Sequence, residues 1–201
     1  MTDNIATIKV GSDVTQLKAL AHPLRLKILG VLRMEGPQTA TALAERFDLN
    51  SGATSYHLRQ LAQHGFIREA EGLGNQRERW WQAAHESTRY ESDAPPASEE
   101  GIASDAYLQS VVAAHLDHIG RAQAARATEP TEWRQASTAS DVTLWLTAEQ
   151  ARDLTERLVG ILLEMKAETP PLDQPGPEDA RRFTVLVHGF PYAPAGKAPS
   201  G

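Results

Sequence analysis

Residues 50–66, NSGATSYHLRQLAQHGF, are the stretch that decides the fold of this chain. Apolar residues recur there at helical spacing, which predicts a helix over 50–63 with one buried face. Asn50 is a suitable N-cap, and Gly65 stands where helices usually end. The residues expected to face inward are Ala53, Leu58, Leu61 and Ala62. The remaining face is polar and rich in serine, so it is available for a partner.

Two further helices are expected ahead of this segment. Pro23 begins the first, because its missing N–H is harmless at a helix start, and Gly36-Pro37 ends it. Thr39 is a fair N-cap for the second, which is short and precedes a tight turn at Asp48-Leu49. This short helix and the helix over 50–63 would form a helix-turn-helix.

A hairpin is expected to follow. Two strand-like segments, 66–71 and 76–83, flank a turn at residues 72–75. The whole order predicts a winged helix-turn-helix over residues 12–84. In such a domain the second helix of the pair fits the DNA major groove, and the hairpin lies along the adjacent phosphates.

Two motifs in this region resemble those of ArsR-type transcription regulators. Residues 20–29, LAHPLRLKIL, are similar to the opening helix motif of that family, and residues 54–67, TSYHLRQLAQHGFI, are similar to its recognition helix. The resemblance covers about residues 12–84. It implies a homodimeric repressor that binds double-stranded DNA. The affinity of such a repressor for DNA changes when an effector binds.

Candidates for DNA contact lie in the recognition helix, in the wing and at two flanking positions. Those in the helix are Ser51, Thr54, Ser55, Tyr56, His57 and Arg59. Those in the wing, suited to phosphate or minor-groove contact, are Asn75, Gln76, Arg77 and Arg79, and the flanking pair is Thr39 and Arg25. Two alternatives stay open: His57 as a structural histidine, and Arg25 and Arg59 as partners in surface salt bridges.

The net charge of −6 does not exclude DNA as a partner, because the charge is unevenly distributed. Residues 12–84 carry nine basic and seven acidic side chains, whereas residues 85–201 carry ten basic and eighteen acidic ones. The predicted DNA-binding segment therefore has a net charge of +2, which is weak support.

Composition predicts where the domains end. Residues 91–101, ESDAPPASEEG, are rich in Pro, Ser and Glu and are expected to link a domain over 12–90 to a second over 102–192. Residues 1–11 are expected to be a flexible N-terminus, and residues 193–201 a disordered tail. The fold class is α+β, mainly helical.

The second domain is expected to contain helices and two strands. Its first helix carries a continuous apolar stripe of Leu108, Val111, Val112, His115, Leu116 and Ile119. Residues 142–146 and 183–188 have strand-like patterns and could pair, while Thr147 and Gln150 form a capping box. This half is expected to dimerise. It is also a candidate for a small-molecule effector pocket, with Trp133, Trp145 and Tyr107 as walls.

Other functional classes receive less support. The chain has no cysteine, so the thiolate metal site of many ArsR-type proteins is excluded. His115 and His118 have ligand-like i, i+3 spacing, but packing in a helical interface is the favoured interpretation, and neither metal nor cofactor is expected. Without a recognised catalytic motif, no enzyme activity is expected. A winged helix that binds only proteins remains the alternative.

The expected location is the cytoplasm. No apolar run reaches the roughly 20 residues that span a bilayer. The first residues lack the basic start and apolar stretch of a signal peptide, and the absence of cysteine is compatible with a reducing compartment.

Overall fold

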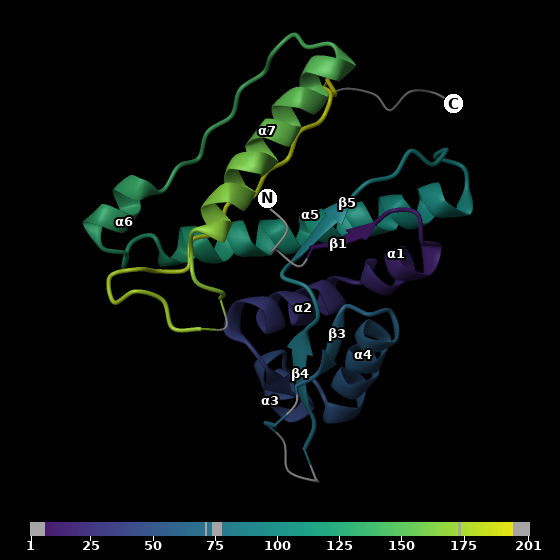
Figure 1. Ribbon diagram of the computed structural model, residues 1–201, viewed down its shortest axis with the longest axis vertical. Coiled ribbons are helices and arrows are strands. Elements are labelled where there is room, and N and C mark those ends of the chain that lie inside the picture. Colours follow the sequence, from purple (N-terminus) through teal and green to yellow (C-terminus); the bar gives the residue numbers. More distant parts are fainter. Residues whose placement is uncertain (1–6, 71, 74–77, 173, 195–201) are drawn as a thin grey trace.

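The computed structural model describes residues 7–70, 72–73, 78–172 and 174–194. The chain is α+β and mainly helical, and its N-terminal part is a winged helix-turn-helix, as predicted (Figure 1). This part consists of α1 (Val14–Leu20), α2 (Pro23–Glu35), β2 (Gln38–Thr39), α3 (Ala40–Arg46), α4 (Ser51–Gln63), β3 (Ile67–Glu69) and β4 (Trp80–Ala83). The other described elements are β1 (Thr7–Val10), β5 (Ser87–Tyr90), α5 (Glu99–Ala125), α6 (Thr131–Ala136) and α7 (Ala148–Ala167).

The predicted ends of α4 are confirmed. The Asn50 side chain accepts a hydrogen bond from the Ala53 amide at 2.8 Å, and Gly65 has a φ of 77°, a left-handed conformation that glycine adopts without strain. Leu58 and Leu61 are fully buried. They join a core that includes Leu17, Ile28, Leu43 and Phe66.

The wing is a three-stranded antiparallel sheet in the order β2-β4-β3. Ile67 lies opposite Ala83, and Thr39 lies opposite Trp80. The hairpin is confirmed with shorter strands than expected, and β2 adds a third strand that the sequence does not suggest. The loop between β3 and β4 is described only in part, since residues 71 and 74–77 lie outside the described residues.

The N-terminal segment is not flexible throughout, so the expectation for residues 1–11 is wrong for Thr7–Val10. These four residues form β1 and pair in parallel with β5. Just after β1, the backbone of Gly11 passes so close to Glu91 that an added Cβ would lie 1.7 Å from the Glu91 carbonyl oxygen. A short strand beside a glycine carries almost no periodic signal, and its partner is far away in sequence.

The first half of α5 belongs to the winged core rather than to a separate domain. Ala103 and Tyr107 lie in the same cluster of buried residues as the helix-turn-helix. Two ion pairs reinforce this docking: Lys18 to Glu99 at 2.6 Å and Lys27 to Asp117 at 3.3 Å. The expected linker over 91–101 is corrected at its end, because α5 already begins at Glu99. Gly101 is buried where a Cβ would lie 2.2 Å from the Pro95 carbonyl oxygen.

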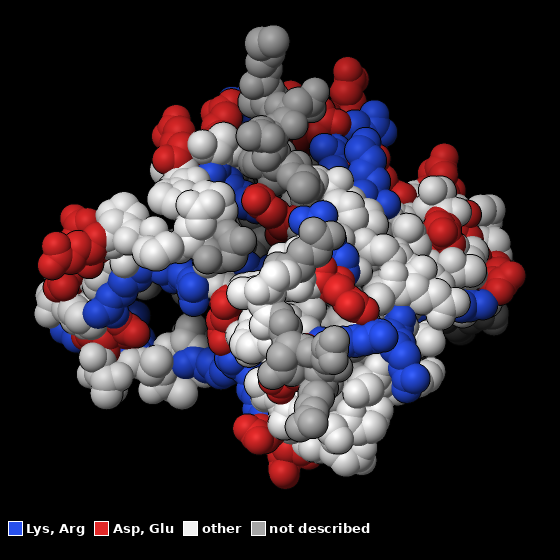
Figure 2. Space-filling view, turned by 60° about the horizontal axis from the view of Figure 1, so that its bottom comes forward, with Lys and Arg blue, Asp and Glu red and all other residues white. Residues whose placement is uncertain are grey.

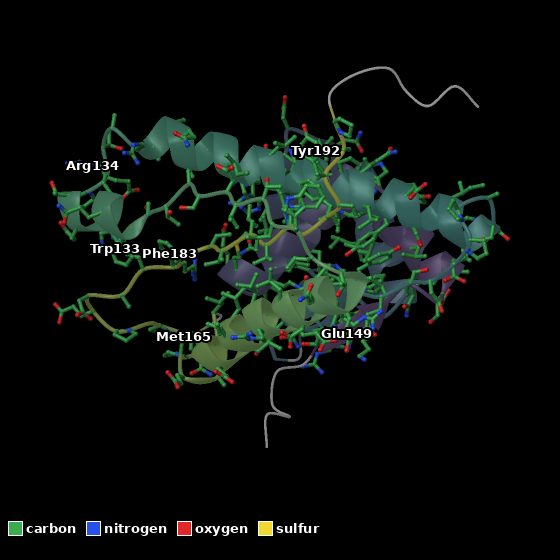
Figure 3. All side chains as sticks on the ribbon, turned by 90° about the horizontal axis from the view of Figure 1, so that it is seen from above. Trp133, Arg134, Glu149, Met165, Phe183 and Tyr192 are labelled. Atoms are coloured by element: carbon green, nitrogen blue, oxygen red, sulfur yellow. The ribbon has the colours of Figure 1, made fainter. Side chains whose placement is uncertain are left out.

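The two strands expected in the C-terminal half are wrong. Residues 142–146 and 183–188 are both irregular in the structure. The later segment runs between α5 and α7 (Figure 3), where His188 Nε2 lies 2.7 Å from His115 Nδ1. Most side chains of both segments are exposed, and neither segment has a strand partner among the described residues, so the apolar patterns were misleading.

The helix opened by the predicted capping box is confirmed as α7. Thr147 Oγ1 accepts from the Gln150 amide at 3.2 Å, and the Gln150 side chain accepts from the Thr147 amide at 2.9 Å. The apolar side chains of this helix are largely exposed, and so are several on the outer face of α5. They are Leu154, Leu158, Ile161 and Met165 on α7, and Leu108, Val112, Leu116 and Ile119 on α5. Among the described residues, no helix is long and apolar enough to cross a membrane.

Candidate nucleic-acid interface

The outer face of α4 is polar and carries no acidic residue. Ser51, Tyr56 and Arg59 are exposed, with Tyr56 at 51% of its maximum, and Ser55 is half-buried beside them. Arg59 Nε donates to the Ser55 carbonyl at 3.2 Å, which leaves the rest of its guanidinium unpaired among the described residues. A helix face without carboxylates can approach phosphates without repulsion.

Gln63 extends this face and is missing from the sequence-based candidates. It is exposed and follows Arg59 by four residues, so it lies one turn further along the same side of α4. The i, i+4 spacing alone would have identified it. Gln63 is also suited to hydrogen bonding with a base edge or a phosphate.

Thr54 does not belong to this face, and the expectation of DNA contact is wrong for it. Its side chain is fully buried, and Oγ1 lies 3.3 Å from the Asn50 carbonyl oxygen. At 100° per residue, Thr54 and Leu58 are on the inner side of the helix while Ser55 and Tyr56 turn outward. The i, i+4 spacing of Thr54 and Leu58 is the signal that could have identified this orientation, which the polarity of the side chain alone does not give.

Arg25 has a structural role that the sequence did not predict. Its Nη2 donates to the Lys18 carbonyl at 2.8 Å, and its Nε donates to the Ala19 carbonyl. The guanidinium thereby satisfies free carbonyls at the C-terminal end of α1, where a positive charge also interacts favourably with the helix dipole. Arg25 makes no salt bridge among the described residues, so the alternative left open for it is wrong there.

Thr39 also has a structural role, so its assignment to DNA contact is corrected. It is buried, and Oγ1 accepts a hydrogen bond from the Ala42 amide at 3.1 Å as the N-cap of α3. We expect Thr39→Ala to lower the free energy of unfolding by about 1 kcal/mol, measured by urea denaturation. Thr41→Ala, an exposed threonine in the same helix, is the matched control and should change it by less. Equal stability of the two variants would contradict the cap.

His57 lies beneath the outer face, in a small aromatic cluster. Its ring centroid is 4.7 Å from that of His22 and 5.4 Å from that of Tyr56. Burial lowers the pKa of His57, and the nearby His22 and Arg25 lower it further. The pKa of His22 is lowered too, by burial and then by Arg25. Both rings are therefore neutral at neutral pH, which supports the structural alternative for His57 and its role as a support for Tyr56.

These lowered pKa values predict that the protein loses stability in mild acid. The unfolded chain has ordinary histidines, so below about pH 6.5 it takes up protons that the folded cluster resists. The free energy of unfolding should therefore be highest above that pH and should fall as the pH approaches the lowered pKa values of His22 and His57. Urea denaturation across this range should show the loss, and His57→Gln should make it shallower. An identical slope in the variant would contradict the assignment.

Of the four residues of the wing that were predicted to contact DNA, Arg79 is among the described residues. Arg79 is exposed and lies 3.1 Å from the Glu69 carboxylate across the hairpin. A surface salt bridge was left open as an alternative for Arg25 and Arg59, and the structure has one at Arg79. Asn75, Gln76 and Arg77 lie outside the described residues. At the base of the wing, Trp81 is buried.

The surface charge is mixed on the side of the molecule that carries the wing. Figure 2 shows Lys and Arg side chains in separate groups, with Asp and Glu side chains among them. Affinity for a polyanion would therefore depend on how α4 fits a groove more than on one continuous basic patch.

The expected effector-pocket walls are not brought together. Tyr107 packs against Tyr90 in the winged core with ring centroids 5.7 Å apart, whereas Trp145 is completely exposed. Trp133 of α6 lies beside Phe183, and their ring centroids are 6.4 Å apart (Figure 3).

The two histidines considered as metal ligands have other surroundings. His115 pairs with His188 rather than with His118, and burial lowers the pKa of both His115 and His118. In the part of the chain that the structure describes, no group of three or more His, Cys, Asp or Glu side chains could hold a metal ion.

Comparisons with known proteins agree with the N-terminal fold. Residues 20–70 match the model of a helix-turn-helix domain family, a segment that runs from the end of α1 to just beyond β3. No curated protein matches the chain. Among solved structures, the crystal structure of the transcriptional regulator PA4135 is similar with 16% sequence identity and a TM-score of 0.30, covering 74% of this chain and 79% of that one. With so low a TM-score and identity, no property of that protein is carried over to this chain.

Proposed function

We propose that the chain is a sequence-specific DNA-binding transcription regulator that acts as a homodimer, with α4 in the major groove and the wing on the adjacent backbone. The observation that carries the proposal is the exposed, acid-free face of α4 on a helix-turn-helix, with Ser51, Tyr56, Arg59 and Gln63 along it. The ArsR-type motifs favour a repressor within this class.

Several apolar side chains of α5 and α7 are exposed in the single chain, which supports a dimer. Obligate dimers bury surfaces of thousands of square ångströms that are largely apolar. The exposed apolar side chains of α5 and α7 are the natural candidates, since they lie away from α4 (Figure 1). A second copy seated there would leave both recognition helices free for a two-fold symmetric site.

The test is DNA binding as a function of salt. Genomic fragments that the purified protein retains should share a palindromic site, and affinity for it should fall steeply as salt rises, because contacts to phosphates release counterions. A scrambled duplex of equal length is the control and should bind more weakly. A winged helix that binds only proteins would retain no specific fragment and would show no salt-dependent binding, which would overturn the proposal.

A further inference from the structure

A cavity of about 220 Å³ lies where the base of the wing meets the ends of α2 and α7. Its lining comes from parts of the chain far apart in sequence: Leu32 and Arg33 of α2, Arg68 of β3, Ala83 of β4, and Lys166 and Leu172 at and after the end of α7. At about 30 Å³ for each water molecule, the space equals roughly seven waters. It is thus large enough for a small organic molecule.

Arg33 is the unusual group in this cavity. Its Nε donates to the His85 carbonyl at 2.9 Å and its Nη2 to the Thr88 hydroxyl at 2.9 Å, so both partners are uncharged. No carboxylate of the described residues lies within ion-pair distance of its guanidinium. Burial lowers the pKa of Arg33 to about 10. A cation in this position without an anionic partner is costly.

Two further cations border the cavity, and Glu86 is the one acid among its described lining residues. Arg68 makes no ion pair within the described residues, and Lys166 pairs with Glu86 at 2.7 Å. Among the described residues, neither Arg33 nor Arg68 therefore has an anionic partner. The remaining wall is apolar, from Leu32, Ala83 and Leu172.

We propose that this cavity binds a small organic carboxylate, whose anionic group pairs with Arg33 and Arg68 while its apolar part contacts Leu32 and Leu172. A guanidinium fork matches a carboxylate in geometry, and the bond is charge-assisted. The apolar walls favour an organic anion over inorganic phosphate. The site differs from the pocket expected at Trp133, Trp145 and Tyr107.

The cavity lies next to the wing, so a bound anion could affect the position of the wing. Arg68 and Gln82 are opposite each other on β3 and β4, so an anion held between Arg33 and Arg68 ties the wing to α2. A regulatory effect on DNA affinity rests on the proposed function, whereas binding of the anion does not. The test is therefore carried out without DNA, so the two can fail separately.

The experiment is calorimetric titration of the full chain with benzoate, compared with benzamide, its neutral counterpart, and with inorganic phosphate. Benzoate should bind once per chain, and benzamide and phosphate should bind at least about tenfold more weakly. Arg33→Gln and Arg68→Gln should each weaken benzoate binding by about tenfold or more. Arg121→Gln removes an exposed arginine of α5 that pairs with Asp117, outside the cavity, and should leave binding unchanged.

Arg68→Gln keeps the test decisive if Arg33→Gln fails to fold, because Arg68 is exposed on an edge strand of the wing sheet. Three results would overturn the proposal. They are the absence of benzoate binding at about 10 mM, equal binding of benzamide, and benzoate binding that the Arg68 substitution leaves unchanged.

Discussion

Replacing Tyr56 and Arg59 together by alanine is expected to lower affinity for the specific DNA site by about a hundredfold or more. Both side chains are exposed on the acid-free face of α4, and neither is part of the core. A lost groove or phosphate contact costs about 1–3 kcal/mol, and a dimer loses each contact in both half-sites. Fluorescence anisotropy with a labelled duplex measures the change.

The matched control is a double alanine variant of exposed arginines outside α4 that point away from the apolar faces of their helices, Arg121 of α5 and Arg152 of α7. It removes more positive charge than the α4 variant and should leave affinity within a few fold. Equal losses in the two variants would mean that general charge, not α4, determines binding. An unchanged affinity after the α4 substitutions would place the recognition surface elsewhere.

The second large effect is expected at the exposed apolar face of α7. Leu158→Glu with Ile161→Glu should convert the proposed dimer to monomer at about 10 μM protein, because two carboxylates per chain would have to be desolvated in an apolar interface. Leu158 and Ile161 are 42% and 57% exposed in the single chain, so the substitutions disturb no core of that chain. Sedimentation velocity gives the oligomeric state.

Arg152→Glu is the control for this change. It reverses a charge on α7 about 200° around the helix from Leu154, so the dimer should persist. Circular dichroism should show equal helix content in all variants. A wild-type chain that sediments as a monomer, or a double variant that stays dimeric, would contradict dimerisation through this face.

Local patterns predicted most of the winged domain correctly. Helix α4, its cap at Asn50 and its end near Gly65 follow from residues close in sequence, and the same is true of the capping box at Thr147. The failures involve residues whose surroundings come from distant segments. Residues 142–146 and 183–188 have strand patterns without a strand partner, and Thr7–Val10 form a strand because β5 lies beside them.

For the candidate site too, some features follow from local periodicity and others only from packing. Periodicity alone predicts which side of α4 is polar, and it correctly includes Ser51, Tyr56 and Arg59. It also puts Thr54 on the inner side with Leu58, although the polar side chain led to a prediction of DNA contact. It cannot tell that Arg25 caps α1 or that Thr39 is buried in the wing sheet. Polar side chains with short or flexible stems are compatible with several environments, and only the packing selects one.

The sequence by itself therefore determined the helix-turn-helix, its hairpin and the direction of the α4 face, because capping, turn chemistry and helical period act over a few residues. Tertiary structure alone decided the docking of α5 on the winged core, the pairing of β1 with β5, and the grouping of Arg33, Arg68 and Lys166 around one cavity. These arrangements join residues as far apart in sequence as Arg33 and Lys166, which are 133 positions apart. The physical reason is that burial and charge balance depend on every segment that packs at a point, and no local pattern carries that information.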